Sequence, residues 1–220
     1  MLKKLAFAAA LIGSLFGVST AANAALVIMP GTPSVLPGNY DPSPSVPGVA
    51  PGFAGSIGAV LQLTAFAVLK FEYLGKEASF NNRFHFDLNN DNVLDPTDVQ
   101  FSTGSTAPGS SFMAFLDTAA TYQNILPFAF GYNSTSASVL NVLRALAATP
   151  NLFMAIDPNN PNAVLIFLDD SGAGPDVDFD DMIIRVTIVS EVPEPATIGM
   201  LGLALLMIGG FFAFGRRRLA

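Results

Sequence analysis

The alternation of apolar and polar side chains along the middle of the chain limits its fold more than any other feature. Leu69, Phe71 and Tyr73 occupy every second position, and Phe80, Phe84, Phe86 and Leu88 form a second series that also alternates. Successive side chains of a strand point to opposite faces, so this pattern predicts strands with one buried face. The composition predicts further strands at 112–116, 125–132, 151–156, 163–168 and 182–189, with the DPNNPN stretch 157–162 as a hairpin turn.

One segment instead fits the spacing of a helix. Its apolar residues are Val139, Leu140, Val142, Leu143 and Leu146, and its stop signal is Pro150. Many short strands, frequent turn signals and 19 phenylalanines predict a mainly β chain. The expected fold is an antiparallel β-sandwich or jelly-roll-like domain with this short helix.

The N-terminus reads as a secretory signal peptide over residues 1–24. Lys3 and Lys4 give it a basic start, residues 5–18 are apolar or small, and Ala22 and Ala24 form a small-x-small cleavage site. The mature protein is therefore expected to begin at Ala25. An uncleaved N-terminal anchor is the alternative interpretation.

The C-terminus reads as a membrane anchor with a basic tail. Residues 196–214 carry no charge and are long enough to cross a bilayer as a helix. Arg216, Arg217 and Arg218 follow at once and are expected to stay on the cytoplasmic side, which leaves the body outside. A buried core helix is the alternative.

Pro193, Glu194 and Pro195 stand immediately before this apolar run. Two prolines deny the segment a helix and keep it extended. In this position, with the arginines and the signal peptide, the tripeptide resembles the PEP-CTERM sorting signal of Gram-negative bacteria. The resemblance implies an exosortase, a membrane-embedded processing enzyme, as partner and a tail at 192–220 that is temporary, as in other removable anchors.

Composition limits what the remaining body can do. Residues 25–55 are a Pro/Gly-rich extended segment, with seven prolines and four glycines in residues 30–52, read as a linker or as a strap along the domain. Residues 56–191 are the expected β-sandwich. The body holds five basic residues against all seventeen acidic ones, so five minus seventeen gives −12, which argues against nucleic acid as a partner. No cysteine is present, which excludes disulfides and thiol catalysis.

The segment DLNNDNVLDPTD, residues 87–98, has the spacing of a calcium loop. Oxygen-bearing groups stand at positions one, three, five, seven, nine and twelve, supplied by Asp87, Asn89, Asp91, the Val93 carbonyl, Asp95 and Asp98. Asn92 replaces the usual glycine and Asp98 the usual bidentate glutamate, and the flanks look like strand. We therefore expect calcium in a β context; the alternative is a turn that satisfies its own backbone.

A second acidic group follows at 169–181. Alternation places Asp176, Asp178 and Asp180 on one side, where they form a cation site, an acidic hydrogen-bonding corner or a solvated turn. This DVDFDD motif, with the earlier GKEASFNNRF stretch, resembles a group of bacterial surface proteins with a β-sandwich body. The matching positions are Gly75, Glu77, Ala78, Asn82 and Phe84, then Asp176, Asp178, Phe179, Asp180 and Asp181.

The expected function is that of an exported, non-enzymatic protein of the cell surface or exopolysaccharide matrix, stabilised by calcium. Two alternatives remain: a secreted hydrolase of the glycosidase type and a permanently anchored protein. No paired carboxylates in a cleft mark a hydrolase, and tryptophan, the usual platform for sugars, is absent. His85, the one histidine, alternates with Phe84 and Phe86 and is expected to face solvent.

Overall fold

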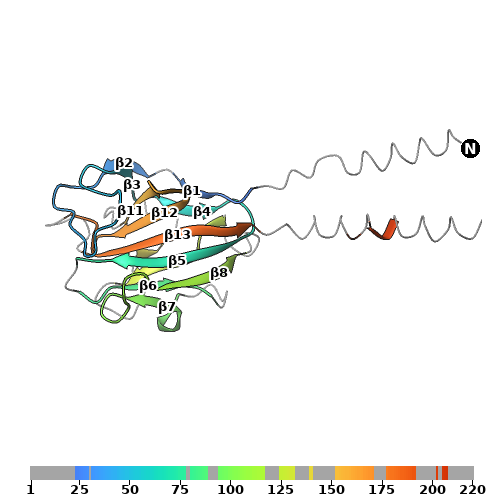
Figure 1. Ribbon diagram of the computed structural model, residues 1–220. Helices are drawn as coiled ribbons and strands as arrows, with labels where there is room; N and C mark the ends of the chain where they lie inside the picture. Colours follow the sequence, from blue (N-terminus) through green and yellow to red (C-terminus); the bar gives the residue numbers. More distant parts are fainter. Residues whose placement is uncertain are drawn as a thin grey trace, which may run out of the picture. The chain divides into compact units, whose positions relative to one another are not determined.

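The alternating segments of the sequence form antiparallel strands in the computed structural model (Figure 1). The structure describes residues 23–29, 31–77, 80–88, 94–116, 124–131, 139–140, 152–170, 177–191, 202 and 205–207. In chain order, the strands are β1 (Leu26–Met29), β2 (Thr32–Val35), β3 (Ala54–Ile57), β4 (Val60–Leu63), β5 (Ala67–Gly75), β6 (Arg83–Phe86), β7 (Val99–Ser102), β8 (Ser111–Leu116), β9 (Phe128–Gly131), β10 (Val139–Leu140), β11 (Leu152–Asp157), β12 (Asn160–Leu168) and β13 (Met182–Glu191).

These strands pair into three antiparallel sheets. A seven-stranded sheet has the order β2-β3-β11-β12-β13-β5-β8, a four-stranded sheet has the order β10-β9-β6-β7, and β1 pairs with β4. The predicted mainly β, antiparallel class is confirmed. The predicted strands at 112–116, 151–156, 163–168 and 182–189 correspond to β8, β11, β12 and β13, and the predicted turn joins β11 to β12 around Pro158 and Asn159.

One face of the seven-stranded sheet packs on the four-stranded sheet, which gives a β-sandwich-like core rich in phenylalanine. β5 alternates buried and half-buried positions along its whole length, as predicted for Leu69, Phe71 and Tyr73. Phe84 of β6 lies at the centre, with its ring 5.8 Å from that of Phe71 and 5.2 Å from that of Phe130. Burial of such rings supplies much of the energy that holds two sheets together.

The other face of the seven-stranded sheet is covered in part by residues 36–53, here called the strap. Leu36, Tyr40 and Val46 of the strap are buried in a second apolar cluster with Phe153 and Phe167 of the sheet. The Tyr40 ring meets the Phe167 ring edge to face at 5.9 Å. The Pro/Gly-rich segment therefore lies along the domain, and β2, which contains Pro33, forms the edge of the sheet, where a residue without an amide hydrogen is tolerated.

The predicted helix is wrong where it can be compared. Val139 and Leu140 form β10 and pair with Phe130 and Ala129 of β9, while residues 141–150 lie outside the described residues. Periodicity alone does not separate a short apolar strand from a helix. Here, pairing with β9 makes residues 139–140 a strand. Within residues 23–191 as described, the helical element is the 3-10 turn η1 (Pro96–Asp98).

The chain divides into two compact units, one formed by Asn23–Val192 and the other by the two ends of the chain. Residues 202 and 205–207 are the described part of the latter, and they are helical. Among the described residues, no helix has the length and apolar character needed to cross a membrane. The predicted signal helix and most of the predicted span at 196–214 lie outside the described residues.

Candidate cation sites

The predicted calcium loop at 87–98 can be followed at its two ends. Asp87 directly follows β6, and Asp98 ends the turn η1; both side chains are buried. Asn89, Asp91 and Val93 lie outside the described residues. Two of the six expected ligands are thus placed in the interior at the base of the loop, where a carboxylate needs a partner.

Asp95 and Asp98 form a reciprocal capping box around η1. The Asp95 carboxylate accepts hydrogen bonds from the Thr97 amide at 2.7 Å and from the Thr97 hydroxyl at 2.6 Å, while Asp98 accepts from the Asp95 amide at 2.9 Å. The hydrogen bonds from Thr97 lower the pKa of Asp95. At these two positions the loop satisfies its own backbone, as the alternative interpretation of the sequence required.

The prediction that His85 faces solvent is wrong, because its side chain is fully buried. The pairing of β6 with β7 shifts register between Phe84 and His85, so the simple alternation fails at this point. The loop then covers the ring: His85 Nδ1 lies 3.0 Å from the Asp95 carbonyl oxygen. Phe80 and Leu88, predicted to be buried, are exposed because both lie outside β6.

A second cluster brings together Glu77, Asp178 and Asp180. One carboxylate oxygen from each residue lies within 4.8 Å of the other two. Asp178 and Asp180 were expected to lie together, and they do; Asp176, the third expected member, lies outside the described residues. Glu77 takes part instead, since β5 and β13 are antiparallel and the residues after β5 meet those before β13. The Glu77 amide donates to the Asp180 carbonyl at 2.8 Å.

Asp180 is the buried centre of this cluster. Its side chain is fully buried, and its Oδ2 accepts a hydrogen bond from the Asp41 amide of the strap at 2.6 Å. Burial raises the pKa of Asp180 and repulsion by Glu77 raises it further, whereas the Asp41 amide opposes both. Between Asp178 and Asp180, Phe179 has a left-handed backbone (φ 62°) and a buried ring that packs on Phe153.

A further group of carboxylates adjoins Asp180 along the chain. Asp181 accepts a hydrogen bond from the Asp170 amide at 2.7 Å, and Asp170 accepts one from the Asn82 side-chain amide at 2.7 Å. Burial raises the pKa of Asp181 to about 7, and repulsion from Asp170, Asp169 and Asp180 adds to that rise, against the hydrogen bond from the Asp170 amide. Four carboxylates are thus held close together here, and burial together with mutual repulsion raises the pKa values of Asp180 and Asp181.

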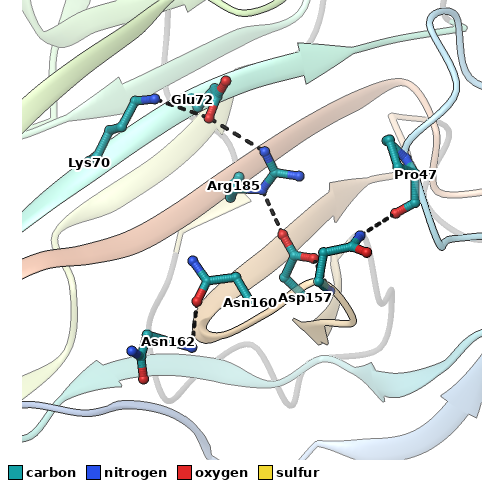
Figure 2. Close-up of polar contacts among 8 residues, drawn as sticks. Pro47, Lys70, Glu72, Asp157, Asn160, Asn162 and Arg185 are labelled. Carbon is teal, nitrogen blue, oxygen red and sulfur yellow. Dashed lines mark hydrogen bonds and ion pairs between the residues drawn. The ribbon is translucent and has the colours of Figure 1, made fainter.

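The outer face of the seven-stranded sheet carries a separate polar network, drawn in Figure 2. Arg185 of β13 binds Asp157 of β11 through Nε at 2.7 Å and approaches Glu72 of β5 at 3.5 Å, and Lys70 reaches the same Glu72 oxygen at 3.3 Å. Asp157 is buried, whereas the other three side chains are partly exposed. Each acid here is neutralised by a basic side chain of the protein, so this network needs no added cation.

The residues of the predicted sorting signal, Pro193, Glu194, Pro195, Arg216, Arg217 and Arg218, lie outside the described residues. Sequence reasoning did not single out Glu77 as a ligand, because nothing local reveals that β5 pairs with β13. Comparison with protein-family models, with curated proteins and with solved structures finds no significant match.

Proposed function

We propose that this chain is an exported, non-enzymatic protein of the cell surface or exopolysaccharide matrix of a Gram-negative bacterium, stabilised by calcium. Its β-sandwich-like body is the cargo. The N-terminal signal peptide directs the body across the membrane, and the C-terminal signal holds it there until an exosortase-type enzyme removes the tail.

The agreement between the folded unit and the predicted processing points carries this proposal. The compact body runs from Asn23 to Val192, while the signal peptide is predicted to end at Ala24 and the sorting motif to begin at Pro193. β13 ends at Glu191, immediately before that motif. Removal of either end therefore leaves every strand of the body in place.

The start of the body is fixed in a way that is compatible with cleavage. The Ala25 amide donates to the Thr64 hydroxyl at 2.9 Å, and that hydroxyl contacts the Asn23 carbonyl at 3.3 Å. After cleavage behind Ala24, the new amino group of Ala25 would keep Thr64 as an acceptor, and β1 would keep its pairing with β4. The mature N-terminus would thus stay attached to the sandwich.

A non-enzymatic role is supported by the burial of two of the three carboxylates in the acidic cluster. Glycoside hydrolysis needs two carboxyl groups open to a sugar, one on each side of the scissile bond. Asp178 and Asp180 are both buried, and Asp180 is hydrogen-bonded to the strap. The chain's one histidine is also buried, with its Nδ1 against a backbone carbonyl, so it is poorly placed to act as a base.

The experiment is to express the full chain in a Gram-negative host with and without an exosortase and to separate membrane, periplasmic and extracellular fractions. With the enzyme, we expect the wild type to leave the membrane in a shortened form. Glu194→Ala should stay in the membrane at the longer length. Glu191→Ala, an exposed acid three residues earlier, is the matched control and should behave as the wild type.

Retention of the wild type in the membrane at full C-terminal length, with the enzyme present, would contradict processing and support the permanently anchored alternative. A chain found in the cytoplasm would contradict export itself.

A further inference from the structure

We propose that Glu77, Asp178 and Asp180 bind one calcium ion that clasps the strap onto the sandwich. This inference rests on the calcium-stabilised body proposed above and assigns the ion to a site that includes Glu77, which lies outside both acidic motifs of the sequence. The site joins three segments far apart in the chain: the strap, the end of β5 and the approach to β13.

The spacing of the carboxylates fits a single ion. Calcium binds oxygen at about 2.3–2.6 Å, so two oxygens on opposite sides of one ion are about 5 Å apart. The three carboxylate oxygens all lie within 4.8 Å of one another, inside that limit. Carboxylates and water are the ligands that calcium prefers, and its flexible coordination tolerates an irregular set better than magnesium does.

Two buried polar atoms at this place lack partners. Among the described residues, Asp180 Oδ1 and the Tyr40 hydroxyl have no hydrogen-bond partner, although both side chains are at least nine-tenths buried. They belong to the same region, since the amide of Asp41, the chain neighbour of Tyr40, donates to Asp180 Oδ2 at 2.6 Å. A buried polar atom without a partner costs about 1–3 kcal/mol. An ion on Asp180 Oδ1, with a coordinated water beneath Tyr40, would satisfy both atoms.

The strap is bound at this place and would respond to the ion. The Asp41 amide donates to Asp180 Oδ2, and Ser43 forms a backbone bridge with Lys76, the neighbour of Glu77. The contact is close: a Cβ at Gly75 would lie 3.0 Å from the Ser43 carbonyl oxygen. Without a cation, the three carboxylates repel one another next to the strap; a cation bound between them offsets this repulsion and holds Asp180 in place to accept the Asp41 hydrogen bond.

The test measures thermal unfolding and hydrogen–deuterium exchange of the full chain in detergent, with calcium and with excess chelator. For the wild type, we expect calcium to raise the Tm by several degrees and to slow exchange in the peptide that contains Asp41. Asp180→Asn and Glu77→Gln should lose most of both effects. In chelator these variants should melt at or above the wild type, because each removes one repelling charge.

Glu191→Gln is the matched control, since it removes an exposed acid at the other end of β13, and it should keep the full calcium response. A calcium shift retained by both Asp180→Asn and Glu77→Gln would place the ion elsewhere and overturn this inference, while leaving calcium stabilisation intact. If calcium raised the Tm but left hydrogen–deuterium exchange in the peptide containing Asp41 unchanged, the proposal that the ion holds the strap on the sandwich would be wrong. No shift in the wild type would end both calcium proposals and leave export untouched.

Discussion

Tyr73 shows what burial does to one ionisable side chain. It lies in β5 with 1% of its surface exposed, facing Phe101 across the core. Burial raises its pKa from 10 to about 12, because the phenolate would lose its hydration. The neutral phenol is thus the form that the folded protein accepts.

The sign of the pH effect follows from this shift. Below pH 10, Tyr73 is neutral in both the folded and the unfolded protein, so its contribution to the free energy of unfolding is complete there. This contribution is lost as the pH rises from 10 toward 12, because the unfolded protein ionises first. A pKa difference of two units between the folded and the unfolded protein corresponds to a loss of about 2–3 kcal/mol in the free energy of unfolding. We expect Tyr73→Phe to flatten the loss of stability between these values, as measured by Tm against pH. An alkaline loss as steep as that of the wild type would contradict the assignment.

His85 and Glu77 mark the limit of what single residues reveal in sequence. His85 was expected outside because alternation was extended through Phe84 and Phe86, but the shifted register and the covering loop bury it. Glu77 carries no local signal for a cation site. Its neighbours Asp178 and Asp180 are about a hundred positions away, and only the pairing of β5 with β13 brings them together.

At the scale of elements, the ion pairs on the outer face of the seven-stranded sheet differ in how much they contribute to the free energy of unfolding. Asp157 ends β11 and is buried, so removing its partner leaves a charge without hydration, whereas the pair between Lys70 and Glu72 is partly solvated. Breaking a buried pair costs about 3–5 kcal/mol, and an exposed pair contributes about 0–1 kcal/mol. The pair between Arg185 and Asp157, which links β13 to β11 across β12, is therefore expected to stabilise the fold more than the pair between Lys70 and Glu72 within β5.

We expect Arg185→Met to lower the free energy of unfolding by about 2–4 kcal/mol and Lys70→Met, the matched control, by less than about 1 kcal/mol. Urea denaturation of both variants beside the wild type measures the difference. Equal losses in the two variants would show that burial of Asp157 does not decide the strength of this network.

Elements were predictable where the signal was local. β5, β8, β11, β12 and β13 follow from alternation, from runs rich in branched and aromatic residues, and from a strong turn at Pro158. The segment around β10 was predicted as helix because its apolar residues from Val139 to Leu146 follow helical spacing, whereas the pairing of β10 with β9 is a tertiary effect. The order of the sheets, with β5 between β13 and β8, could not be read from the sequence at all.

At the scale of the whole molecule, two kinds of information define the protein. The body between Asn23 and Val192 has its own core and a negative seam at Glu77, Asp178 and Asp180. We propose that the ends carry signals for export and sorting, which the sequence indicates through the small-x-small site, the Pro193–Pro195 motif, the apolar run and the three arginines. A net charge of −7 for the full chain conceals the more acidic body, because half of its ten basic residues lie in the two terminal segments. The proposed removal of both ends would leave this more acidic body on its own.

The proposed export and release are tested by the intact mass of the protein recovered from outside a cell that carries an exosortase. We expect a chain that begins at Ala25 and ends close to Pro195, so that the body is free of both terminal segments. A recovered mass that still includes residues 196–220 would contradict the central claim that the body is cargo released from a removable anchor.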